Sequence, residues 1–96
     1  MAIEYTESAA KHGLTQPEAT HVMLNYRWKV EKFGEPRLPG LPAPDLYIGA
    51  SPSGQMLEVM SYRQEPRDLV IFHVMPLRTK IRNQALDELE RRSNQQ

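Results

Sequence analysis

Three histidines are the first candidates for chemistry in this chain, because an imidazole gains and loses a proton near neutral pH. His12 and His21 stand on either side of an expected helix break, and no Asp or Glu lies four residues from His73. A zinc site needs several ligands in a fixed geometry, so this spacing predicts no metal site. The sequence contains no glycine-rich nucleotide-binding motif, and we expect no cofactor.

His73 interrupts the most apolar stretch of the chain, Leu69–Met75. The alternation of a strand places it on the same face as Leu69, Ile71 and Met75. One interpretation is a core histidine that is satisfied by a backbone or carboxylate partner. The other is a general acid or base on an exposed sheet face, a role for which imidazole groups are suited in general.

Glu58 interrupts a second apolar run, Met56–Met60. A carboxylate in such a place needs either solvent or a cationic partner. One register of the expected hairpin places Glu58 opposite His73, and a register shifted by one residue places Val59 there. The sequence leaves both registers open.

Basic side chains gather directly after the apolar stretch that contains the third histidine. Arg78, Lys80 and Arg82 stand where a last helix is expected to begin. They fit a solvated helix start, or they fit a phosphate-binding surface, because a helix N-terminus also attracts anions. Arg27 and Arg37 would extend the same surface from earlier in the chain.

Aromatic residues lie among these cations. Tyr26, Trp28 and Tyr47 are near the arginines and lysines of the middle segment. Such a mixture suits stacking on unpaired bases. The alternative is that Trp28 and Tyr47 belong to the core. His12, at the end of the first expected helix, fits a partner of the helix dipole on residue type alone.

The composition excludes several classes of protein. The chain has 96 residues, with 12 basic and 12 acidic side chains, so a globally basic nucleic-acid coat is excluded while a local patch is not. It has no cysteine, which excludes disulfides and thiolate chemistry and fits a reducing cytoplasm. No apolar run is long enough to span a membrane, and the first residues do not resemble a signal peptide.

Helix signals occupy the first third of the chain. Thr6 or Ser8 is expected to cap a brief helix that ends near His12, where Gly13 can stop it. A second helix is expected over Gln16–Asn25, because Thr15 and Glu18 form a capping box around Pro17. This helix carries no Lys or Arg, so a DNA-reading helix is not indicated.

The residues that follow the second expected helix predict strands and a last helix. The expected strands are Tyr26–Phe33, Asp45–Ala50, Gln55–Arg63 and Leu69–Met75, with Gly34–Pro44 as a proline-rich loop. Ile3–Tyr5 can begin with an edge strand, and Thr79 can cap a helix whose apolar stripe is Ile81, Ala85 and Leu89. We therefore expect one α+β domain over residues 1–96 with a frayed tail at 93–96. It has two short N-terminal helices, a four-stranded, mostly antiparallel sheet, a C-terminal helix, and helices on one sheet face.

Three segments together resemble BrnT-like ribonuclease toxins over about residues 8–82. Lys11–Ala19 resembles their K-H-G-[V/I]-x-F-x-E-A signature, and Ile48–Val59 resembles their strand-turn-strand, L-G-x-S-x-x-G-x-L-L-x-V. Ile71–Lys80 stands where they carry R-I-I-S-A-R and a basic helix. The chain departs from the pattern at Gln16, which replaces an aromatic residue. It departs again where His73 aligns with an arginine, and where Asp45 or Leu46 takes the place of another arginine.

The resemblance implies a RelE/ParE-like fold and the toxin of a bacterial type II toxin–antitoxin system, which cuts RNA and is blocked by its antitoxin. We therefore expect a metal-independent endoribonuclease of the cytoplasm, with RNA and an antitoxin as partners and a homodimer left open. His73, with His12 as second candidate, would transfer protons, and Arg78 would stabilise transition-state charge. The expected RNA-binding residues are Lys80, Arg82, Arg37, Arg27 and Tyr47.

The alternative is a catalytically inactive module with the toxin fold that binds a partner protein. Exposure separates the two hypotheses. An enzyme should present His73, Arg78 and Lys80 on one open surface, whereas a buried and hydrogen-bonded His73 would favour the binding module.

Overall fold

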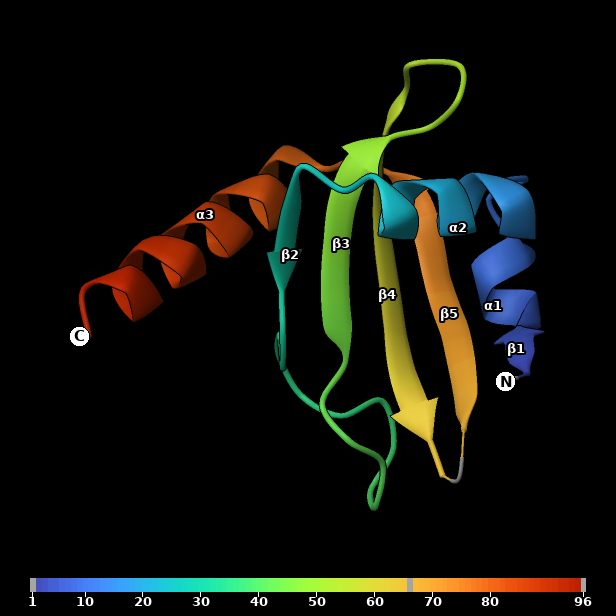
Figure 1. Cartoon of the computed structure of the whole chain (residues 1–96), viewed down its shortest axis with the longest axis horizontal. Helices are drawn as coiled ribbons and strands as arrows, with labels where there is room; N and C mark the ends of the chain where they lie inside the picture. Colours follow the sequence, from blue (N-terminus) through green and yellow to red (C-terminus); the bar gives the residue numbers. More distant parts are fainter. Residues whose placement is uncertain (1, 66, 96) are drawn as a thin grey trace.

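The computed structural model describes residues 2–65 and 67–95, in which three helices accompany a single sheet (Figure 1). The elements in chain order are β1 (Ile3–Tyr5), α1 (Glu7–Ala10), α2 (Gln16–Leu24), β2 (Trp28–Val30), β3 (Asp45–Ala50), β4 (Met56–Gln64), β5 (Asp68–Pro76) and α3 (Thr79–Ser93). Within these described ranges, no helix is both long and apolar enough to cross a lipid bilayer.

The sheet has five strands in the order β1-β5-β4-β3-β2, so the α+β class is confirmed and the expected count of four strands is wrong. The additional strand is β1, which pairs parallel to β5 with Ile3 opposite Leu69. The other pairings are antiparallel. A three-residue strand is too short to show an alternation of its own. It is held here by pairing to β5 and by the Tyr5 hydroxyl, which donates to the Leu14 carbonyl at 2.8 Å.

The two N-terminal helices begin at the expected caps. The Thr6 hydroxyl accepts a hydrogen bond from the Ala9 amide at 3.1 Å, and Thr15 and Glu18 form the capping box of α2. Helix α1 ends at Ala10, short of the expected His12, and α2 ends one residue before the expected Asn25. Both ends are set by the caps rather than by apolar periodicity.

Strand β2 is much shorter than the expected Tyr26–Phe33. Lys32 has a φ of 51°, a left-handed conformation that ends an extended segment. The Lys32 amide donates to the Asp45 side chain at 3.1 Å, which holds this turn against the start of β3. The remaining expected strands agree with β3, β4 and β5 to within one residue at each end.

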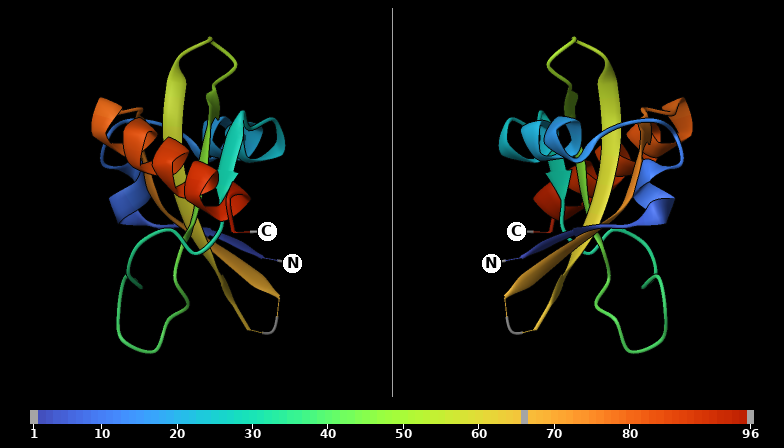
Figure 2. Two further views of the ribbon diagram at one scale, coloured as in Figure 1. Left: turned by 90° about the vertical axis from the view of Figure 1, so that its left-hand side faces the viewer. Right: turned by 90° about the vertical axis from the view of Figure 1, so that its right-hand side faces the viewer.

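Helices cover both faces of the sheet, so the expectation of helices on one face is wrong. Figure 2 shows α2 and the start of α3 on opposite sides of the strands. The first core cluster joins α1 and α2 to alternate strand residues; its members are Ala9, Ala19, Val22, Tyr47, Leu57, Val59, Ile71 and Val74. The second joins α3 to β2 and to the opposite face of β3; its members are Val30, Leu46, Ile48, Ile81 and Ala85.

Strand β5 contains a bulge beside His73. Met60 of β4 pairs with His73 and the next residue of β4, Ser61, pairs with Ile71, which leaves Phe72 without a partner on β4. Neither expected register is therefore correct at His73. The extra residue also changes faces: Ile71 belongs to the first core cluster, whereas His73 lies on the other face with Met60. The prediction that His73 shares a face with Ile71 is wrong for this reason.

Helix α3 begins at Thr79, the residue expected to cap it, so its cap lies one residue earlier than expected. Arg78 is the N-cap residue and Thr79 is already helical, and Arg78 makes no side-chain capping bond of its own. Ile81 and Ala85 are buried against the sheet and Leu89 packs at the edge of the same cluster, which confirms the predicted apolar stripe. Ser93, expected in the frayed tail, is the last residue of the helix, and Gln96 lies outside the described residues.

Candidate functional site

The side chain of Glu58 lies between His73 and Arg78 and makes hydrogen bonds with both. Its side chain is fully buried in β4. Oε1 accepts from the backbone amide of Arg78 at 3.0 Å and from its Nε at 2.9 Å. Oε2 accepts from Nη2 of Arg78 at 3.0 Å and from Nε2 of His73 at 3.1 Å. Four donors thus satisfy a carboxylate that would otherwise be costly to bury.

Local structure brings these three residues together from distant points of the sequence. Glu58 pairs with Met75 across the β4–β5 ladder, and His73 lies two residues before Met75 on the same face. Pro76 then ends β5, and the next two residues lead into α3. Because Arg78 is the N-cap of α3, its amide is free of intrahelical bonding, and Glu58 supplies the acceptor from the sheet. A carboxylate at this end of a helix is also stabilised by the dipole.

The ionisation of Glu58 is fixed by its donors. Burial alone would raise the pKa of this carboxyl group, but hydrogen bonds from His73 and Arg78, together with the charge of Arg78, lower the pKa to about 2. Glu58 is therefore ionised at neutral pH and can only accept hydrogen bonds. Consequently Nε2 of His73 carries a proton, and Nδ1 is the nitrogen left to accept one.

His73 combines features of both interpretations considered from the sequence. Its ring is hydrogen-bonded to a buried carboxylate, yet 21% of the side chain is exposed. A carboxylate that holds an imidazole in one tautomer, and so leaves the other nitrogen as the proton acceptor, is the arrangement of a general base. The same carboxylate would stabilise the imidazolium that forms when this base takes a proton.

Arg78 is engaged rather than free. Its Nε and Nη2 both bond to Glu58, and 43% of its side chain is exposed. These hydrogen bonds raise the pKa of Arg78 above its usual value, so its charge is permanent. Nη1 is absent from the hydrogen bonds found between described residues. It is the part of the guanidinium that a phosphate could contact.

The other predicted cations lie in three places. Lys80 and Arg82 are exposed on the first turn of α3, directly after Arg78. Arg37, from the loop after β2, lies over the ring of Phe72 with its guanidinium carbon 5.4 Å from the ring centroid. Arg27 lies over the ring of Trp28 at 4.7 Å. Arg37 is therefore brought next to the chain neighbour of His73.

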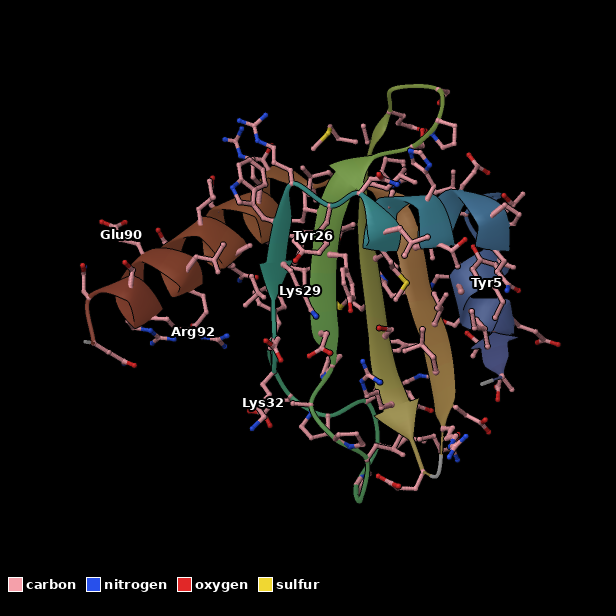
Figure 3. The ribbon with its side chains drawn as sticks, in the orientation of Figure 1. Tyr5, Tyr26, Lys29, Lys32, Glu90 and Arg92 are labelled. Carbon is pink, nitrogen blue, oxygen red and sulfur yellow. The ribbon has the colours of Figure 1, made fainter. Side chains whose placement is uncertain are left out.

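Tyr47 does not belong to this site. It is 8% exposed and lies in the first core cluster, on the face of the sheet opposite to His73. Tyr26 and Lys29 cover its ring at 5.8 and 5.2 Å, and both lie beside β3 in Figure 3. The structure therefore places Tyr47, expected to bind RNA, apart from His73, because successive residues of β3 face opposite sides.

His12 is also separate from the site. It lies in the exposed turn between α1 and α2, the helices that pack against the first core cluster. His73 lies on the face that carries the second cluster. The structure therefore supplies one histidine to the carboxylate site, and not the expected pair.

The groove beside α3 does not coincide with this cluster. A groove of about 630 Å³ lies between residues 32–35 and α3, and its lining excludes Glu58, His73 and Arg78. Among residues 2–65 and 67–95, no three His, Cys, Asp or Glu side chains converge in a way that could hold a metal ion. The chemistry that this cluster can perform is proton transfer by a partly exposed imidazole and charge stabilisation by Arg78.

Sequence reasoning noticed Glu58 but did not assign it to the site. The signal was its place inside an apolar run, which demanded a partner. Comparison with family models, with curated proteins and with solved structures found no match to this chain. The resemblance to BrnT-like toxins therefore stays a prediction.

Proposed function

We propose that this protein is a toxin-type endoribonuclease that cleaves RNA without a metal ion, with His73 as its general base. The observation that carries the proposal is the hydrogen bond between Nε2 of His73 and the buried carboxylate of Glu58. That bond leaves Nδ1 of a partly exposed ring available to accept a proton.

In this mechanism Nδ1 of His73 takes the proton of a ribose 2′-hydroxyl group. The 2′-oxygen attacks the adjacent phosphorus, the bond to the 5′-oxygen breaks, and the leaving oxygen takes a proton from water. The products are a 2′,3′-cyclic phosphate and a 5′-hydroxyl end. Glu58 acts as a positioning residue that holds the ring and stabilises the imidazolium.

Cations around His73 supply the remaining requirements. Arg78 places a permanent charge beside the ring, where negative charge grows on the phosphate in the transition state. Lys80 and Arg82 extend this charge along the first turn of α3 and would hold flanking phosphates. Helix α3 packs against β2 and β3.

The biological role that we propose follows from the sequence resemblance. The protein would act in the bacterial cytoplasm as the toxin of a type II toxin–antitoxin system. Its partner would be an antitoxin that prevents RNA from reaching His73. The RelE/ParE-like fold belongs to the same proposal, and the five-stranded mixed sheet with a C-terminal helix is its structural support.

A second candidate is a catalytically inactive module that binds a partner protein. It is favoured by one observation, the two-point pairing of Arg78 with Glu58, which occupies the cation expected to act in catalysis. In that case the hydrogen bonds that Glu58 accepts from Arg78 and His73 serve only to hold α3 against the sheet.

Expression in a bacterium without an antitoxin tests the two candidates. The parent chain should slow growth, and His73→Gln should restore it at equal protein level. His12→Gln is the matched control, because His12 lies in an exposed turn away from the site, and it should remain toxic. Normal growth with the parent at confirmed high expression would favour the binding module.

A further inference from the structure

Three flat groups lie in a row on the sheet face that carries His73. The ring centroids of Tyr62 and Phe72 are 5.7 Å apart. Arg37 belongs to the proline-rich loop, and its guanidinium carbon lies 5.4 Å from the centroid of the Phe72 ring. Tyr62 is buried, Phe72 is half-buried and Arg37 is exposed, so the row leads from the core to the surface.

The bulge in β5 is what places Phe72 beside His73. In a regular strand two successive side chains point to opposite faces. Here Phe72 contacts Tyr62 and His73 contacts Glu58, and these two partners share a face of β4 because they are an even number of residues apart. The unpaired residue of the bulge therefore presents an aromatic ring on the same face as the imidazole.

We propose that the guanidinium of Arg37, held over the ring of Phe72, forms a stacking site for one unpaired nucleobase, so that the substrate of the site at His73 is single-stranded RNA. This inference rests on the proposed ribonuclease activity and names its substrate class. Bases stack on aromatic rings and on guanidinium planes whatever their sequence. A base within a duplex is already stacked on its neighbours and cannot use the site.

RNA is favoured over a protein partner by the charges around the stack. Lys80 and Arg82 are exposed cations on the adjoining turn of α3. Glu58, the carboxylate that contacts His73, is buried and paired with Arg78, so its charge is neutralised beside the ring. Flat groups beside free cations are the combination by which proteins bind single strands.

Equilibrium binding to three RNA probes tests the stacking site. The protein carries His73→Gln, so that the probes are not cleaved, and fluorescence anisotropy reports the Kd. The probes are a single strand of about eight nucleotides, a strand of equal length whose riboses carry no bases, and a duplex of the first sequence. We expect the first strand to bind at least about 5-fold more tightly than the base-free strand.

Two substitutions locate the effect. Arg37→Lys keeps the charge but removes the plane, and Phe72→Leu keeps an apolar side chain but removes the ring. Each should weaken binding of the single strand by about 5- to 100-fold and leave the base-free strand unchanged. Arg67→Lys, an exposed arginine in the turn between β4 and β5, is the matched control and should change neither. Thermal unfolding shows whether Phe72→Leu folds; if it does not, Arg37→Lys decides.

Equal affinities for the base-bearing and base-free strands would overturn the proposal. So would unchanged binding in Arg37→Lys, or an absence of binding to all three probes at low salt, which would leave the stack as a surface for a protein partner. Cleavage by the parent chain separates the two claims. Base-dependent binding without cleavage would contradict the ribonuclease activity and support the stacking site. Cleavage with base-independent binding would support the ribonuclease activity and contradict the stacking site.

Discussion

The carboxylate of Glu58 and the guanidinium of Arg78 make two parallel hydrogen bonds, Nε to Oε1 at 2.9 Å and Nη2 to Oε2 at 3.0 Å. The pair connects the middle of the sheet to the residue that caps α3. Because the carboxylate is fully buried and also holds His73, one ion pair fixes both the start of the last helix and the orientation of the imidazole. Stability and the proposed chemistry therefore depend on the same side chain.

Glu58→Gln should destabilise the fold. The substitution preserves the size of the side chain but removes the charge that Arg78 and His73 contact, and loss of one partner from a buried pair costs about 3 kcal/mol. Denaturant unfolding at neutral pH measures this change. Glu90→Gln, at an exposed position of α3, is the control and should change the free energy of unfolding by less than about 0.5 kcal/mol. An equal effect of the two substitutions would show that the buried pair adds nothing to stability.

The free energy of unfolding should decrease as the pH is lowered, over a range set by the pKa of Glu58. Its pKa is lowered from 4.5 to about 2 in the folded chain, so its contribution is fully present above about pH 4.5 and is lost as the pH falls toward 2. The contribution at neutral pH is up to about 3 kcal/mol. Unfolding curves from pH 7 to pH 2.5 should therefore show the parent and Glu58→Gln converging below pH 4.5. A constant difference between them over this range would contradict the shifted pKa.

Arg78→Lys should lower cleavage far more than RNA binding. Lysine keeps the charge near the phosphate but cannot make the two parallel bonds that hold Glu58, and hence His73, in place. Single-turnover rates and Kd values for one RNA oligomer separate the two effects. If the variant cleaves like the parent, Arg78 is only a phosphate anchor or a helix-start charge, and the catalytic cation has to be sought at Arg63, Arg37 or Arg27.

Lys80→Ala should weaken RNA binding through charge alone. The formal net charge of the chain is zero, so affinity depends on a local patch and should fall steeply with salt. A plot of log affinity against log salt for a single strand should lose about 0.7 from its slope when one phosphate contact is removed. An unchanged slope would place Lys80 outside the RNA-binding surface.

Much of the fold was predictable because its signals are local. The caps at Thr6 and Thr15, the strand at Asp45–Ala50 and the apolar stripe of α3 follow from residues within a few positions of each other. The edge strand expected at Ile3–Tyr5 is β1, but its parallel pairing with β5 was not predictable, since three residues carry no periodicity and this pairing is a long-range choice. The shortening of β2 depends on the contact of Lys32 with Asp45, which lies 13 residues further along the chain.

The site was predictable in its residue types but not in its geometry. His73 stood out because a histidine interrupts the most apolar strand, and Arg78 stood out because it is the first cation after that strand. Their common partner, Glu58, depends on the bulge at Phe72, and a bulge of one residue leaves no mark in a hydrophobic pattern. His12 was predicted from the family pattern, and Tyr47 was predicted from the cations near it in the sequence. The strand faces and the turn between α1 and α2 place both away from His73.

Single-turnover cleavage of a labelled RNA oligomer, in buffer with a chelator of divalent metals, tests the central claim most directly. The parent chain should produce fragments that end in a 2′,3′-cyclic phosphate. His73→Gln should lower the rate by about 10²- to 10⁴-fold, the usual share of a general base, with thermal unfolding unchanged to within a few degrees. The control, His12→Gln, should cleave like the parent. Cleavage by His73→Gln at the parental rate, or no cleavage by the folded parent chain, would contradict the account.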